Sequence, residues 1–204
     1  MSYLDNQYER IIKKIISFLL SAQLISENEI EIYYFGIEVM LLKMIHIASY
    51  FFLVYVFNIN MTDFTIVFTI FCFLRTNAGG AHAETREGCY IFSCCMVVVV
   101  AHIMQFQINR ESIIAIIIVD VLLLYFMAPV QNKNRELDKD DSAYFRKKLF
   151  VVNVVFLVLC ICLISFKKNL FWLYTVGLST ETFLVVVGRI QNTIGREEGV
   201  KRES

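Results

Sequence analysis

The stretch LRTNAGGAHAETREGC, residues 74–89, is a polar, glycine-bearing break between two strongly apolar segments, 62–74 and 89–106. It carries one of the three histidines, His82, and one of the six cysteines, Cys89. A base and a thiol on one short loop are the parts that a cysteine nucleophile needs. We interpret the apolar segments on either side as structural scaffold, and the break between them as a candidate active site.

The composition excludes an ordinary soluble domain. The 204 residues are 57% hydrophobic and include a single proline, and several apolar runs reach or approach the roughly 20 residues that span a bilayer as a helix. Backbone polar groups in lipid must be paired internally, so these runs predict helices. Runs such as MVVVV at 96–100 lack the alternation of a β-barrel strand. We therefore expect an all-α, polytopic membrane bundle in a single integral-membrane domain, residues 1–194, followed by a polar tail, 195–204.

Six transmembrane helices are expected. They are 33–57, 62–74, 89–106, 113–130, 149–166 and 170–190. A capping-box pattern from Ser26 to Glu29 precedes the first, and Pro129 ends the fourth. The second has only 13 residues, about 20 Å of helix against a hydrocarbon core of roughly 30 Å. It either tilts into a thinned bilayer or stops short, and stopping short would place the start of the following loop inside the membrane thickness.

Residues 8–25 predict a basic amphipathic helix. Apolar side chains recur at helical spacing, and Arg10, Lys13 and Lys14 collect on the other side. Such a helix lies in the membrane interface. The alternative is a helix that packs on its own protein.

The distribution of Lys and Arg predicts the orientation. Six crossings place the N-terminal segment, the 75–88 loop, the charged 131–148 loop and the C-terminal tail on one side. With Arg189, at the end of the last helix, counted with the tail, that side has fifteen basic residues against three on the other. The positive side faces the cytoplasm, so both termini and the 75–88 loop are expected there. That compartment is reducing, which keeps Cys89 a free thiol. The other five cysteines lie in or beside apolar runs and are interpreted as packing residues.

Helix geometry constrains how His82 and Cys89 could act together. In one continuous helix, residues seven apart lie about 10.5 Å apart along the axis, too far for proton transfer. The chain must therefore fold back between them, and Gly79 and Gly80 allow the preceding helix to end. A helix beginning near Thr85 would put Cys89 in its first turn, where the helix dipole favours a thiolate.

The residues leave the third member of the site open. Glu84, Asn77 and Glu38 are all candidates to orient the imidazole. Arg75 could neutralise an acidic substrate group or brace the loop by pairing with a carboxylate. His82-x-Glu84 echoes a zinc deaminase motif, but the required P-C-x-x-C is missing, so no metal or cofactor is expected.

Polar residues inside the apolar segments permit other functions. Glu38, Lys43, His46 and Ser49 fall within an arc of roughly 140° and can all face the protein interior. Intramembrane ionisable residues often have a function, although they can also form an inter-helix hydrogen-bonding stripe. One alternative is a small-molecule or peptide transporter whose path runs along Glu38, Lys43, His46, Asp120 and Glu181. Another is a membrane anchor or sensor subunit that holds a partner through its basic 131–148 loop. Zero net charge gives no support to nucleic-acid binding.

The loop motif resembles that of the AgrB (accessory gene regulator B) family, integral-membrane cysteine endopeptidases of Gram-positive quorum sensing. The resemblance rests on Arg75-x3-Gly79-Gly80-x-His82-x6-Cys89, on Ala128-Pro129-Val130, and on the charged segments 134–137 and 146–148. Chain length, six expected spans and the amphipathic N-terminus are consistent with it.

The resemblance implies a cell-membrane enzyme without a cofactor. Cys89 would be the nucleophile and His82 its base, with Arg75, Gly79, Gly80 and Glu84 supporting the loop. The implied substrate is an AgrD-like propeptide, whose acidic tail is removed through an acyl thioester before a thiolactone or lactone ring closes. Glu38, Arg146, Lys147 and Lys148 are candidate substrate-binding residues, although the basic three could serve only as topology determinants. The family also suggests a homodimer.

Overall fold

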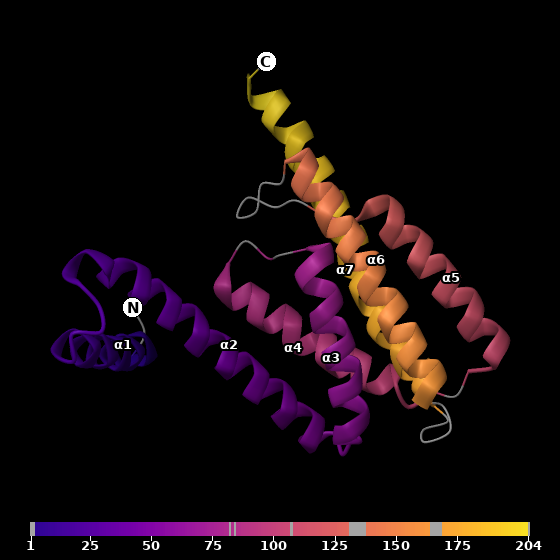
Figure 1. The fold of residues 1–204 in the computed structure, drawn as a ribbon, viewed down its shortest axis with the longest axis horizontal. Helices are drawn as coiled ribbons and strands as arrows, with labels where there is room; N and C mark the ends of the chain where they lie inside the picture. The colour runs from indigo at the N-terminus through magenta and orange to yellow at the C-terminus, as the bar shows by residue number, and fades with distance from the viewer. Residues whose placement is uncertain are drawn as a thin grey trace. The chain divides into compact units, whose positions relative to one another are not determined.

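The computed structural model describes residues 3–81, 83, 85–106, 108–130, 138–163 and 169–203, and in this part of the chain helices are joined by short turns and loops (Figure 1). The helices, including one short 3-10 helix η1, are α1 (Tyr3–Ser21), η1 (Glu27–Glu29), α2 (Ile30–Val56), α3 (Met61–Ala78), α4 (Arg86–Ile103), α5 (Arg110–Met127), α6 (Lys139–Leu163) and α7 (Leu170–Glu203). Within these described ranges there is no β-strand, and an isolated bridge joins Gly79 to Val130. The all-α prediction is confirmed.

Side-chain caps begin several helices at the predicted breaks. The Glu29 carboxylate accepts hydrogen bonds from the Ser26 backbone nitrogen at 2.9 Å and from its hydroxyl at 2.7 Å, just before α2. Asn60 caps α3 and Asn109 caps α5, each accepting from a backbone nitrogen three residues later. These bonds satisfy N–H groups that the start of a helix otherwise leaves unpaired. At the other end of α5, the helix stops just before Pro129, as predicted.

The chain divides into two compact units, residues 1–52 and 53–204. In the first unit, α1 packs its apolar face on α2. Ile12 and Ile16 are buried in a cluster that includes Tyr34 and Ile37 of α2. This contact corresponds to the alternative in which the amphipathic helix packs on its own protein.

Other side chains of α1 are exposed and could contact the membrane interface. Lys13 pairs with Glu9 at 3.2 Å on the polar face, while Ile11 and Phe18 are exposed. The expected location in the membrane interface therefore stays a prediction.

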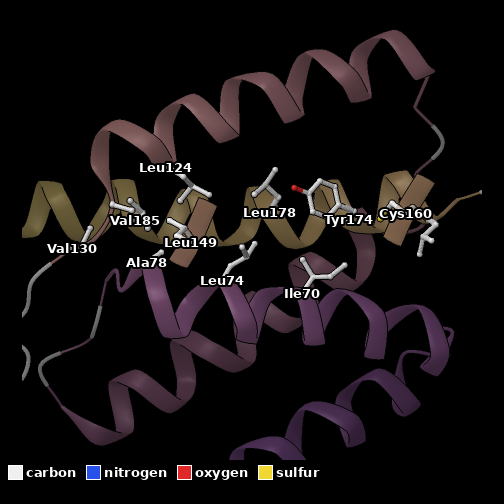
Figure 2. Close-up of a cluster of buried hydrophobic side chains, with 12 residues drawn as sticks. Ile70, Leu74, Ala78, Leu124, Val130, Leu149, Cys160, Tyr174, Leu178 and Val185 are labelled. Carbon is white, nitrogen blue, oxygen red and sulfur yellow. Dashed lines mark hydrogen bonds between the residues drawn. The ribbon is translucent and has the colours of Figure 1, made fainter. Parts of the chain in front are cut away.

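α7 is the central helix of the second unit, because α3, α4, α5 and α6 all contact it. Leu173, Tyr174, Leu178 and Val185 of α7 are fully buried. Figure 2 shows Tyr174, Leu178 and Val185 along α7, where they meet side chains of α3, α5 and α6. This packing gives α7 a fixed position against the end of α3, where the predicted loop begins.

Hydrogen bonds pair polar side chains inside this unit. The Ser179 hydroxyl of α7 donates to Asp120 of α5 at 2.5 Å, and the Tyr174 hydroxyl donates to Asn153 of α6 at 3.0 Å. Burying such groups unpaired would cost free energy, so the bonds tie α5 and α6 to α7.

Three helices are longer than their predicted apolar segments. α3 continues past Leu74 to Ala78, so Arg75 lies on a helix rather than in the loop. α6 begins at Lys139 and α7 continues to Glu203, which brings much of the charged 131–148 and 195–204 segments into helices. Polarity alone does not stop a helix, because Lys, Arg and Glu have helix propensities close to that of Ala. Acidic residues in the first turn of α6 also suit its dipole.

Two helical segments among the described residues are long and apolar enough to cross a membrane. They are Glu27–Val56, with a mean hydropathy of 1.9, and Leu170–Ile194, with a mean hydropathy of 1.6. Glu87–Ile103 is a shorter apolar helix. The expected six crossings are not confirmed by this finding and stay a prediction.

Candidate active site

The predicted loop leaves α3 through two glycines. Gly79 has a φ of 72° and Gly80 a φ of 131°, values that side chains disfavour. A Cβ on Gly79 would lie 2.5 Å from the Val130 carbonyl oxygen. A Cβ on Gly80 would overlap the Arg75 guanidinium and lie 2.9 Å from the Leu184 carbonyl oxygen. The turn therefore requires glycine at both positions.

Arg75, in the last turn of α3, holds this turn by its backbone. Its Nη1 donates to the Gly79 carbonyl and its Nη2 to the Ala81 carbonyl, each at 2.6 Å. Nη1 also lies 3.7 Å from Oε1 of Glu181, a fully buried residue of α7. Of the two roles predicted for Arg75, the structure shows the brace, and the paired carboxylate is that of Glu181.

The backbone of α7 contacts the same turn. The Ala81 nitrogen donates to the Leu184 carbonyl at 2.8 Å. Gly188, one helical turn further, comes so close that a Cβ there would lie 2.6 Å from the Ala81 nitrogen and 2.7 Å from the Gly80 carbonyl carbon. The turn is thus held against both α3 and α7.

The segment after α5 lies against the turn as well. The Val130 nitrogen donates to the Ala78 carbonyl at 2.8 Å, and Arg189 of α7 donates to the Met127 carbonyl at 2.6 Å. The Ala-Pro-Val segment noted in the sequence therefore packs against the start of the candidate loop.

Cys89 lies in the first turn of α4, as predicted. Thr85 caps this helix, because its hydroxyl oxygen accepts from the Gly88 nitrogen at 3.0 Å. The Cys89 nitrogen donates to the Thr85 carbonyl at 3.0 Å, and its side chain is half-buried. Cys89 therefore lies at the capped N-terminal end of α4.

His82 and Glu84 lie outside the described residues. Ala81, just before His82, is 7% exposed, whereas Ala83, just after it, is exposed. The pairing of His82 with Cys89 and the supporting role of Glu84 stay predictions.

The other candidates to orient His82 lie on helices. Asn77 is buried on α3 and donates from its amide to the Phe73 carbonyl at 2.7 Å. Glu38 lies on α2 and is partly exposed within the first unit, as are His46 and Ser49, while Lys43 is exposed.

The basic candidates for substrate binding lie on α6 rather than in a loop. Lys147 and Lys148 are exposed, and the Lys148 Nζ lies 5.9 Å from the centre of the Tyr144 ring. Arg146 is also exposed, and its Nε donates to the Ala128 carbonyl at 3.4 Å. Arg146 therefore contacts the segment that lies against the turn.

All six cysteines are free thiols. Cys160 is buried, in agreement with a packing role, whereas Cys95 and Cys162 are exposed. Among the described residues, no group of three His, Cys, Asp or Glu side chains could hold a metal ion.

The sequence did not reveal the contribution of α7 to this site. Glu181 stood only on the alternative transport path, and Leu184 and Gly188 were not singled out. The presence of an acid in an apolar segment was a signal, but its partner Arg75 lies on another helix. Only the packing of α3 against α7 brings the two together.

Comparison with known families gives this arrangement its context. The family model of accessory gene regulator B (AgrB) matches residues 12–185. The chain belongs to the accessory gene regulator B family. This membership indicates a role in the processing of quorum-sensing peptides and implies an AgrD-like propeptide as substrate. Together with the two apolar helical segments, it also indicates a membrane protein.

The chain is similar to AgrB-like proteins of clostridia. The chain is 30% identical over 171 residues to an AgrB-like protein of Clostridium perfringens (strain SM101 / Type A), covering 79% of each chain. It is 31% identical over 146 residues to AgrB-like protein 2 of Clostridium perfringens (strain 13 / Type A), covering 67% of this chain and 68% of the relative. No solved structure matches the chain.

The AgrB match includes most of the residues that form the turn. Arg75, Cys89 and Glu181 all lie within the matched residues 12–185, whereas Gly188 and Arg189 lie just beyond them.

Proposed function

We propose that this AgrB family member is a membrane cysteine endopeptidase that removes the C-terminal tail of an AgrD-like propeptide and cyclises the remaining peptide. The observation that carries the proposal is the position of Cys89, a half-buried free thiol in the first turn of a capped helix. Glycine at position 88 suits this cap, because a Cβ there would lie 2.8 Å from the Thr85 hydroxyl oxygen. His82 follows the turn that Arg75 and α7 hold, seven residues before Cys89.

The first step is acyl transfer to the enzyme. His82 takes the thiol proton as Cys89 Sγ attacks the carbonyl carbon of the peptide bond before the tail. The resulting tetrahedral intermediate collapses as the C–N bond breaks, and the imidazolium returns the proton to the leaving amine. The tail departs with a free amino terminus, and the rest of the propeptide remains as a thioester on Cys89.

The second step closes the ring. A thiol or hydroxyl of the bound peptide attacks the thioester carbonyl, its proton passes by way of His82 to the Cys89 sulfur, and a thiolactone or lactone leaves. Thioester exchange with a thiol is nearly balanced in energy, so positioning of the internal nucleophile and exclusion of water must favour the ring over hydrolysis.

The proposal places α2 to α7 across the membrane as six spans. The helices α3, α4 and α5 have 18 residues each, about 27 Å of helix against a core of roughly 30 Å. On α5, Ile114, Ile118, Leu122 and Phe126 recur every fourth residue and are 50–72% exposed. The same helix buries the acidic Asp120, and an exposed apolar face opposite a buried ionisable side chain suits lipid as the solvent.

The proposed orientation puts the termini, the loop and the basic end of α6 in the cytoplasm. There Lys147 and Lys148 would attract the acidic tail of the propeptide, with Arg146 beside them. Glu38 stays a candidate substrate-binding residue, and a homodimer is the proposed assembly.

Mass spectrometry of a propeptide co-expressed with the full chain tests the function. We expect Cys89→Ala to abolish tail removal and cyclisation, and His82→Ala to lower the rate by about 10²–10⁴-fold. Cys95→Ala is the matched control, because it removes an exposed thiol from the same helix and should leave processing unchanged.

The same measurement separates cleavage from transport. Release of unprocessed propeptide from cells would support a transporter. A normal amount of cyclic product from the Cys89→Ala protein, inserted at the wild-type level, would overturn the endopeptidase proposal.

A further inference from the structure

Glu181 is an acid in an unusually demanding position. It lies on the central helix α7 and is 0% exposed. Neither of its carboxylate oxygens accepts a hydrogen bond from a described residue. An ionised carboxylate is costly to bury unless a nearby cation compensates its charge.

The nearby cation is the guanidinium of Arg75. Its Nη1 lies 3.7 Å from Oε1 of Glu181, close enough for an ion pair but too far for a hydrogen bond. The Arg75 side chain is only 19% exposed, so water screens the pair weakly. The attraction therefore orients the guanidinium while leaving its N–H groups to other acceptors.

Those acceptors are the carbonyl oxygens of the turn. Nη1 and Nη2 of Arg75 each donate at 2.6 Å, one to Gly79 and the other to Ala81. The Leu184 carbonyl, from the helical turn after Glu181, accepts from the Ala81 nitrogen at 2.8 Å. The helix α7 thus holds Ala81, the last residue before His82, in two ways. It binds Ala81 directly through the Leu184 carbonyl and indirectly through the pairing of Glu181 with Arg75.

We propose that Glu181 is a positioning residue of the endopeptidase: it holds the Arg75 guanidinium against the Gly79 and Ala81 carbonyls and thereby sets where His82 stands relative to Cys89. This inference rests on the proposed function. It assigns to α7 a part in the active site that goes beyond scaffolding. Glu181 itself contacts neither substrate nor thiol in this role.

The test measures how fast iodoacetamide alkylates Cys89 as a function of pH, in full-length protein whose other five cysteines are Ala. If His82 pairs with Cys89, the wild-type alkylation midpoint lies below that of His82→Ala. Glu181→Gln keeps the size of the side chain and removes its charge, so we expect its midpoint to move towards that of His82→Ala. The kcat for propeptide processing should fall by about 10- to 100-fold with KM within about twofold, because a displaced base slows chemistry more than binding.

Asp120→Asn is the matched control. Asp120 is also a buried acid that contacts α7, but it accepts from Ser179 rather than pairing with Arg75. We expect its alkylation midpoint to equal that of the wild type. If Asp120→Asn and Glu181→Gln shifted the alkylation midpoint equally, the cause would be general loosening of the bundle. That result would overturn the specific role of Glu181.

A double variant provides the second measurement and does not depend on Glu181→Gln inserting alone. Since Glu181 acts through Arg75, Arg75→Gln/Glu181→Gln should process propeptide at the rate of Arg75→Gln. A further 10-fold loss in the double variant would contradict the inference.

The two proposals fail in different ways. Equal alkylation midpoints for the wild type and His82→Ala, with processing retained in Cys89→Ala, would reject the endopeptidase. If His82→Ala shifted the alkylation midpoint but Glu181→Gln did not, only the role of Glu181 would be rejected.

Discussion

At the scale of single residues, the turn that follows α3 depends on glycines that leave no room for a side chain. Gly80 has a φ of 131° and faces the Arg75 guanidinium and the Leu184 carbonyl at distances that leave no room for a Cβ. An added methyl group must therefore displace Arg75 from the carbonyls that it binds, or move the turn away from α7.

We expect Gly80→Ala to lower the free energy of unfolding by about 1–3 kcal/mol, from backbone strain and displaced contacts. Processing of the propeptide should fall more than this modest loss of stability would explain, because Ala81 and the following His82 shift. Thermal unfolding in detergent and product mass spectrometry measure the two effects.

Gly36→Ala is the control, since Gly36 lies in helix α2 and a Cβ there would meet nothing within 4 Å. It should leave processing unchanged and raise stability by about 0.5–1 kcal/mol. Wild-type processing by Gly80→Ala would show that the observed turn is not needed for activity.

At the scale of elements, the start of α4 determines the environment of Cys89. Thr85 accepts from the Gly88 nitrogen, and the first turn that it stabilises includes the thiol. The end of α3 and the start of α4 are thus two separate helix termini, with the candidate base between them. The sequence predicted this division from Gly79 and Thr85, although α3 proved longer than its apolar run.

We expect Thr85→Ala to cost about 1 kcal/mol of stability and to slow alkylation of Cys89 at neutral pH, because the frayed helix end stabilises thiolate less. Thr85→Ser keeps the hydroxyl and should retain the wild-type alkylation rate.

Asn109→Ala removes the cap of α5, where Asn109 accepts from the Ser112 nitrogen at 2.8 Å. It should cost a similar amount of stability and leave the Cys89 alkylation rate unchanged. An equal slowing by both cap variants would point to overall destabilisation instead.

At the scale of the whole molecule, the proposed membrane topology makes a prediction about the two sides of the bilayer. Ile108 lies between α4 and α5, and Asp138 lies just before α6. Six crossings with cytoplasmic termini put Ile108 outside the cell and Asp138 inside.

We expect a membrane-impermeant maleimide to label Ile108→Cys in intact cells, in a protein whose native cysteines are Ala. Asp138→Cys should be labelled only after permeabilisation. Labelling of Asp138→Cys in intact cells would contradict the proposed orientation.

Local features of the sequence determined the helical architecture and the candidate loop. Apolar runs, Asn and Thr caps, paired glycines and the spacing from Arg75 to Cys89 act over a few residues, so they can be recognised without a fold. The family followed from the same loop motif. Helix ends within charged segments could not be predicted in this way, because Lys, Arg and Glu are compatible with both helix and loop.

Only the tertiary structure decided what holds the turn before His82. Arg75 and Glu181 are far apart in the chain, and their pairing depends on how α3 and α7 pack and rotate against each other. The close approach of Gly188 to Gly80 and Ala81 likewise depends on that packing. Periodicity indicates which side of a helix is buried but not which residue it meets, so these contacts follow from the packed bundle alone.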